Sequence, residues 1–349
     1  MSLELDQMTN GLTPDHDLFF PEKPADPEMR ESTAIWLFEE NGAFALPRVG
    51  IEGIASSWDK RAYQANFAFP GGRILDGSGA EPGPSPFGPD GRPTVYGAGP
   101  LTFRCLDPFR RWLVTYDGEA VDGTVDQQIH RKLDRSHRIP VRIEAELVMQ
   151  TPAWVEDNSP ERLARMSDAE RSEAGNMGIG WRLEHLFRGE GTLVLDGASR
   201  TFRCVGSRIK RQSVRPLVSF RGHCWQSALF PDGRAFGFIT FPSADDGSEP
   251  LNHGYVYQDG KLHPARATKV PWLRRLVDEG DDVTFELESA LGTTRIEART
   301  LLTTYRIMNQ DDGLPFAFNL HQGGARYSWD GMTSYGMIER SCKSEQLTG

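Results

Sequence analysis

Short strand-like segments separated by tight-turn signals dominate the second half of the chain. Asp-Gly pairs, which favour β-turns, occur at residues 196–197, 232–233, 259–260 and 330–331. Between them lie short runs rich in β-branched and aromatic residues, the composition typical of strands. Many short strands at this spacing predict an antiparallel sandwich or barrel and argue against a fold built from long helices.

The first half shows the same signal. Residues 141–149 alternate between apolar and polar positions at period two, which predicts a half-buried strand. A hairpin is expected over residues 33–49, with further strands at 101–105 and 111–116. Residues 77–100 contain seven glycines and six prolines, so we expect a long loop without a regular ladder there. This loop is either a flap over a pocket or a plain surface insertion.

Chain length and one helix signal suggest how the chain is divided. A chain of 349 residues has room for about two domains. Asn158 or Ser159 can cap a helix that starts at Pro160 and ends before Gly175, so a linker helix is expected over residues 160–174. We therefore expect an extended lead-in, a first β domain, a linker segment and a second β domain, at residues 1–30, 31–158, 159–177 and 178–349.

Charge and the ends of the chain restrict the classes of partner. With 39 basic and 49 acidic residues the net charge is −10, which argues against binding to a nucleic-acid backbone. The first twenty residues lack the basic and apolar regions of a secretory signal, and no apolar run is long enough to span a membrane. The four cysteines have neither zinc-finger nor redox spacing, so we expect them in the core of a cytoplasmic protein.

The common cofactor motifs are missing from the sequence. It contains no dinucleotide-binding glycine motif, no Walker A loop, no zinc-protease helix motif and no nucleophile elbow. None of the eight histidines is paired at the spacing of metal ligands on a helix. We therefore expect a function without a cofactor or a bound metal.

The strand around residues 219–230 is the strongest candidate for a ligand-binding wall. Arg221, His223 and Trp225 share one face at period two. The opposite face is apolar and holds Phe220, Cys224, Ala228 and Phe230. We expect the apolar face to pack outward and the mixed face to line a barrel cavity, with His223 as an acid or base, Arg221 orienting the ligand and Trp225 shaping the pocket. The alternative is an ordinary exposed face with a hydrogen-bonded histidine.

Two further strands add candidate residues. Tyr255 and Tyr257 share a strand face, and Tyr257 could donate a proton, although cross-strand packing is an alternative. Tyr335 and Glu339 also share a face; if that face is interior, the pKa of Glu339 is expected to be raised and the residue could act as an acid. The alternative is an edge strand on which Glu339 is solvated or paired with an arginine.

Aromatic stripes elsewhere could shape the same pocket. Trp181 leads a mostly apolar strand face, and Trp112 and Tyr116 lie on a similar stripe in the first half. We expect these three side chains, together with Tyr255, Tyr335 and Trp225, to contact a ligand.

Several segments together resemble the AttH-like and carotenoid 1,2-hydratase-like proteins. They are residues 208–215 (Arg-Ile-Lys-Arg-Gln-Ser-Val-Arg), 222–225 (Gly-His-Cys-Trp), 230–234 (Phe-Pro-Asp-Gly-Arg), 254–260 and 335–339, with 101–105 and 112–118 in the first half. The resemblance implies two lipocalin-like β-barrel domains packed side by side. Many relatives have Arg-Asp-His-Ser-Trp-Gly-x-Arg at the place of residues 208–215. This chain lacks that acid, histidine and tryptophan, so a proton for hydration has to come from other residues.

The sequence thus favours an all-β protein and an enzyme of lyase or isomerase type. It would add or remove water, move a double bond or cyclise a hydrophobic terpenoid, steroid-like or aromatic molecule without a cofactor. The competing hypothesis is a non-catalytic carrier of apolar small molecules. A homodimer is left open.

Overall fold

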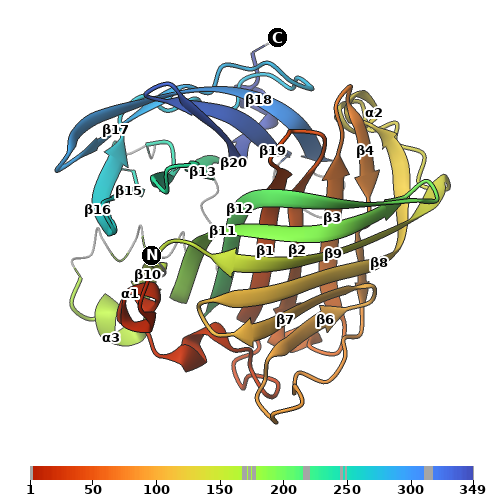
Figure 1. Ribbon diagram of the computed structural model, residues 1–349, viewed down its shortest axis with the longest axis horizontal. Helices are drawn as coiled ribbons and strands as arrows, with labels where there is room; N and C mark the ends of the chain where they lie inside the picture. The colour runs from red at the N-terminus through yellow and green to blue at the C-terminus, as the bar shows by residue number, and fades with distance from the viewer. Residues whose placement is uncertain are drawn as a thin grey trace.

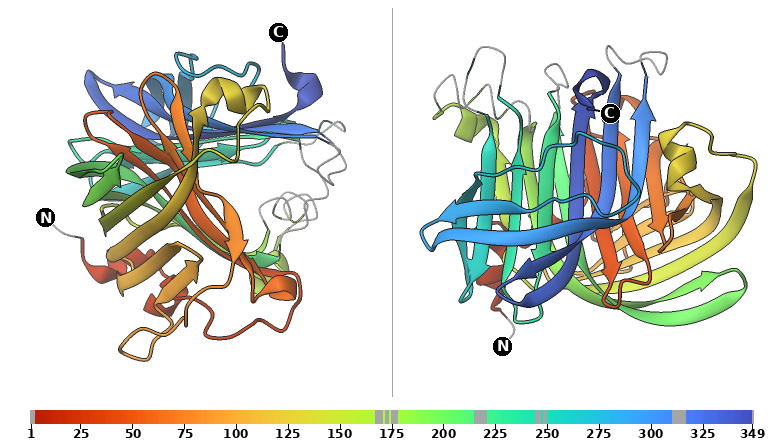
Figure 2. Two further views of the ribbon diagram at one scale, coloured as in Figure 1. Left: turned by 90° about the vertical axis from the view of Figure 1, so that its right-hand side faces the viewer. Right: turned by 90° about the horizontal axis from the view of Figure 1, so that it is seen from above.

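The computed structural model describes residues 3–166, 171, 174, 178–214, 221–243, 247, 250–309 and 317–348. Two antiparallel sheets lie side by side, the first drawn in red to green and the second in cyan to blue (Figures 1 and 2). This confirms the predicted all-β class. No helix among the described residues is long and apolar enough to cross a membrane.

Twelve strands form the first sheet. They are β1 (Met29–Glu39), β2 (Ala45–Ile54), β3 (Arg61–Ala68), β4 (Arg73–Asp76), β5 (Gly79–Glu81), β6 (Val95–Ala98), β7 (Leu101–Asp107), β8 (Arg111–Thr124), β9 (Arg138–Met149), β10 (Trp154–Asn158), β11 (Ile179–Leu195) and β12 (Ala198–Val214). Their pairings run through the circuit β1–β2–β3–β4–β8–β9–β11–β12 and back to β1, so the sheet closes on itself. Closure leaves few edges open to a further chain.

The second sheet is a closed barrel of eight strands in sequence order. They are β13 (His223–Leu229), β14 (Ala235–Thr240), β15 (Asn252–Gln258), β16 (Lys261–Ala267), β17 (Phe285–Ser289), β18 (Gly292–Met308), β19 (Phe318–Trp329) and β20 (Met332–Lys343). The helical elements are short: α1 (Leu5–Thr9), η1 (Pro14–Asp17), η2 (Ala55–Ser57), α2 (Val125–Ile129), α3 (Pro160–Leu163) and η4 (Ser344–Gln346).

The sheets divide at a different place from the expected boundary at residues 159–177. β11 and β12 pair with β9, β10 and β1, so residues 179–214 belong to the first sheet. The division therefore lies between Val214 and His223. Strand patterns mark where a strand lies, but its partner is set by contacts that are distant in sequence.

The structure contradicts two local predictions and confirms the start of a third. The lead-in is not simply extended, because it holds α1 and η1. The segment 77–100 contains β5, which pairs with β3, and β6, which pairs with β7, so the expectation of no ladder there was wrong. The linker helix begins as predicted, with the Ser159 hydroxyl accepting from the Arg162 amide; residues 167–170 and 172–173 of its expected length lie outside the described residues.

The N-terminal segment fills the first barrel. Leu18 and Phe19 are buried in its core, and the fully buried Asp17 carboxylate accepts from the Trp112 indole (3.1 Å) and from Arg208 (2.8 Å). Tyr116 lies in the same core and donates to a backbone carbonyl. Trp112 and Tyr116 are thus core residues rather than pocket walls.

The interior of the second barrel is also filled. Phe236 of β14 contacts Phe285 of β17 and Tyr327 of β19 across the barrel, with ring centroids 4.9 and 5.0 Å apart. Cys224 and Ala228 of β13 belong to this cluster. The apolar face of β13 therefore points inward and the face of His223 and Trp225 points toward the first sheet, the reverse of the prediction. Period two separates two faces but does not show which one is interior.

Candidate active site between the two sheets

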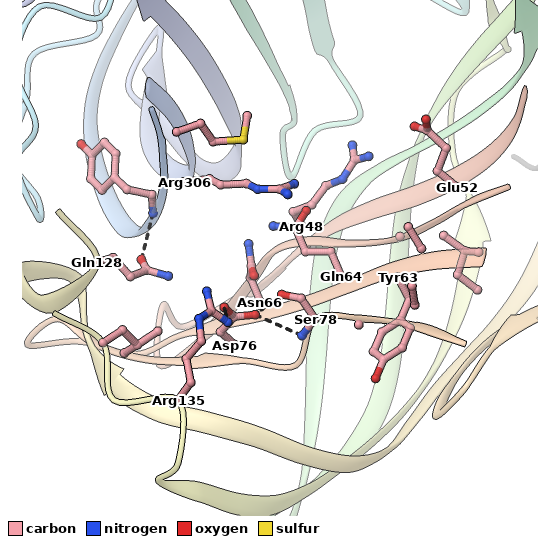
Figure 3. A pocket seen from close by; sticks show the side chains of 18 of the residues that line it. Arg48, Glu52, Tyr63, Gln64, Asn66, Asp76, Ser78, Gln128, Arg135 and Arg306 are labelled. Atoms are coloured by element: carbon pink, nitrogen blue, oxygen red, sulfur yellow. Dashed lines mark hydrogen bonds and ion pairs between the residues drawn. The ribbon is translucent and has the colours of Figure 1, made fainter. Parts of the chain in front are cut away.

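A pocket of about 1110 Å³ lies between the two sheets (Figure 3). Arg48 on β2 and Gln64 and Asn66 on β3 line it from the first sheet. Arg306 on β18 lines it from the second sheet, and Gln128 of α2, also in the lining, accepts from the Tyr305 amide. The volume suffices for a small organic ligand.

The polar floor of this pocket is hydrogen-bonded to the second barrel. Gln64 Nε2 (2.7 Å) and Asn66 Nδ2 (3.3 Å) both donate to Gln322 Oε1, and Asn66 Nδ2 also donates to Thr304 Oγ1 (3.2 Å). Gln322 Nε2 in turn donates to Glu339 Oε2 at 2.8 Å. A continuous polar chain therefore links the pocket to a buried carboxylate.

His223, Glu339 and Ser341 form a cluster at the far end of that chain. His223 Nε2 lies 3.1 Å from Glu339 Oε1, and His223 Nδ1 lies 2.5 Å from Ser341 Oγ. Pairing of β13 with β20 places His223 opposite Ser341 and therefore near Glu339, two residues away along the same face. The structure thus brings together the two residues that the sequence singled out as acid and base.

Glu339 is ionised, contrary to the expectation of a raised pKa. Burial alone would raise the pKa of this carboxyl, but the hydrogen bond and charge of His223, the charge of Arg48 and the hydrogen bond from Gln322 lower it to about 2. The sequence could not show these partners, because Arg48 and Gln322 come from other strands.

The charge on Glu339 fixes the direction of every hydrogen bond in the chain. A carboxylate can only accept, so His223 Nε2 must carry a hydrogen and Gln322 must present its amide nitrogen. The Gln322 oxygen then accepts from Gln64 and Asn66, which leaves their carbonyl oxygens to accept from a ligand. In the tautomer with its hydrogen on Nε2, His223 accepts from the Ser341 hydroxyl at Nδ1.

Most of the other predicted site residues lie outside this pocket. Trp225, Tyr255, Tyr257 and Tyr335 pack in the apolar cluster between the sheets. The Trp225 indole donates to Glu184 Oε2 (3.0 Å).

Arg221 and Trp181 make different contacts. Arg221 Nε donates to the Pro242 carbonyl at 3.1 Å. Trp181 lies at the first barrel, where the Lys210 ammonium is 4.5 Å from its ring centroid.

Sequence reasoning missed the residues that line the pocket and connect it to the acid–base pair. Arg48, Gln64, Asn66 and Gln322 belong to no recognisable motif. One signal was available: Gln64 and Asn66 share a face of β3 at period two, and Asn66 is a polar residue buried within an otherwise apolar strand end. Across the described ranges, no three His, Cys, Asp or Glu side chains lie close enough together to hold a metal ion.

The family model described as "Domain of unknown function (DUF7064)" matches residues 13–343 of the chain. The chain belongs to the DUF7064 family. No protein of curated function matches the sequence.

This DUF7064 protein shares its fold with several proteins of known structure. An AttH protein from Nitrosomonas europaea superposes with a TM-score of 0.58 at 12% identity, over 97% of both chains. CghA in complex with Sch210972 gives 0.55 at 12% identity over 98% and 97% of the two chains. Kievitone hydratase from Nectria haematococca gives 0.50 at 8% identity over 99% and 96%. The expected resemblance to AttH-like and hydratase-like proteins is thereby confirmed for the fold.

Proposed function

We propose that this DUF7064 protein is a cofactor-independent lyase or isomerase that moves a proton on a small molecule bound between the two sheets. The observation that carries the proposal is the hydrogen-bonded chain from Gln64 and Asn66, through Gln322, to His223 and Glu339. The name of one structural neighbour, kievitone hydratase, supports the same class of reaction.

The proposal gives separate tasks to the two ends of the chain. The pocket holds the molecule, and His223 is assigned the proton, because histidine is the side chain that most often serves as a general acid or base. The ionised Glu339 keeps the imidazole oriented and stabilises its charged form. Gln322 joins the two ends by hydrogen bonds alone, since an amide does not relay a proton, and a substrate group would have to displace this amide to reach Glu339 and His223.

A carrier without catalytic activity is the second candidate. It is favoured by the position of the Gln322 amide, which separates Glu339 from the space that a ligand occupies. A carrier needs the pocket but gains nothing from a buried carboxylate that is held ionised beside a histidine.

Product analysis separates the two candidates. Terpenoid, steroid and phenolic substrates are incubated with the protein and analysed by mass spectrometry, where a mass change of one water or an isomeric product indicates the enzyme. We expect His223→Ala and Glu339→Gln each to lower turnover by about 100-fold or more, the scale of general acid–base catalysis. His137→Ala, at an exposed histidine, is the matched control. Recovery of unchanged bound ligand would favour the carrier, and full turnover in both site variants would exclude the assigned roles.

A further inference from the structure

The pocket lining is cationic although the whole chain has a net charge of −10. Its basic side chains are Arg48, Lys60, Arg131, Arg135 and Arg306, and its acidic ones are Glu52 and Asp76. A local excess of one charge, opposite in sign to the chain as a whole, is the arrangement that draws an oppositely charged ligand into a site.

Both lining acids are already paired with arginines. Glu52 Oε1 lies 2.8 Å from an Arg30 guanidinium nitrogen. Asp76 lies 3.4 Å from Arg135 and also accepts from the Ser78 amide at 3.0 Å. Glu52 is therefore paired outside the lining, whereas Asp76 offsets the lining Arg135, which leaves only part of the positive charge of the pocket without a carboxylate partner among the described residues.

Arg48 and Arg306 carry part of that remaining charge, together with Lys60. Among the described residues, neither guanidinium has a carboxylate within ion-pair distance. The Arg48 guanidinium lies over the ring of the buried Trp36, 4.8 Å from its centroid, which holds the side chain in place without neutralising it. The charge of Arg48 lowers the pKa of Glu339, but both oxygens of Glu339 already accept hydrogen bonds, from His223 and Gln322. In the view of Figure 3, Arg48 and Arg306 lie above Gln64 and Asn66.

We propose that the pocket takes a small molecule with an apolar body and one anionic group, a carboxylate or an acidic enol or phenol, bound by Arg48 and Arg306. Planar guanidinium groups match such oxygens with paired hydrogen bonds. Leu133, Ile307 and Met308 line the same pocket and give the apolar body its contacts. The inference rests on the proposed function for the place of binding, and it narrows the bound small molecule to one that carries an anionic group.

Matched acids and esters test the charge requirement. The probes are cinnamate, abietate and 3-oxo-4-androstene-17-carboxylate, each compared with its methyl ester, and binding is measured by isothermal titration calorimetry. We expect at least one carboxylate to bind about 10- to 100-fold more tightly than its ester, the range of a charge-assisted hydrogen bond. Arg48→Gln and Arg306→Gln should each reduce this preference. Arg326→Gln, at an exposed arginine on β19, should leave it unchanged.

Three results would overturn the inference: equal binding of acid and ester, no binding of any carboxylate, or a preference that survives the double variant Arg48→Gln, Arg306→Gln. Because Arg306 is exposed, its substitution is expected to leave the fold intact, which thermal unfolding checks. Binding is measured without turnover, so the inference and the proposed function can fail separately. Acid preference without catalysis leaves an anion-selective carrier, whereas turnover of neutral substrates without acid preference refutes the inference alone.

Discussion

Substitution of Glu339 by glutamine tests the electrostatic centre of the proposed site. The change keeps the size of the side chain and removes its charge. The new amide can still accept from Gln322, but its nitrogen then faces His223, which must shift its hydrogen to Nδ1. We expect the variant to fold and to be less stable than the natural chain at neutral pH. We also expect it to lose the part of the pH dependence of stability that comes from the titration of Glu339.

The size of that component follows from the pKa of Glu339. Its folded value of about 2, against an ordinary value of 4.5, corresponds to about 3 kcal/mol, since one pH unit is worth about 1.4 kcal/mol. Because the folded pKa is depressed, this stability is present above pH 4.5 and is lost as the pH falls toward 2. Between about pH 5 and pH 3 the loss is about 2 kcal/mol.

Urea unfolding at a series of pH values measures this difference directly. The free energy of unfolding of the variant is subtracted from that of the natural chain at each pH, so groups common to both, such as His185, cancel. We expect the gap to shrink by about 2 kcal/mol from pH 5 to pH 3. A gap that stays constant over this range would show that Glu339 is not held ionised by its neighbours, and the argument for fixed hydrogen-bond directions would fail with it.

Three further substitutions test the buried polar groups. Asp17→Ala leaves the buried Arg208 guanidinium without its carboxylate partner and should lower the free energy of unfolding by about 3–5 kcal/mol in urea titrations, whereas a loss under 1 kcal/mol would contradict the buried pair. Burial lowers the pKa of His185 to about 4, so the protein should lose stability as the pH falls from 6.5 toward 4; His185→Leu should flatten that dependence, and an unchanged slope would refute the assignment. Trp225→Phe removes a donor to the buried Glu184 and should cost about 1–3 kcal/mol by the same measurement, with no loss expected if water replaces the indole.

The candidate site shows how far local patterns reach. The sequence indicated that His223 and Glu339 belong to strands with unusual polar faces, and pairing of β13 with β20 brings the two side chains together. The prediction of a raised pKa for the buried Glu339, which rested on burial alone, was wrong. Arg48 and Gln322, which reverse that expectation, lie on strands whose proximity no local pattern reveals.

The sequence by itself determined the all-β class, most strand positions and the separation of β13 into an apolar and a polar face. These features depend on neighbours within a few residues, where the alternation of side chains and the turn propensities act directly. Only the tertiary structure decided that β11 and β12 belong to the first sheet and that the polar face of β13 points toward that sheet. The hydrogen bond between Gln64 and Gln322 spans 258 residues of sequence, and such contacts arise from the packing of whole sheets.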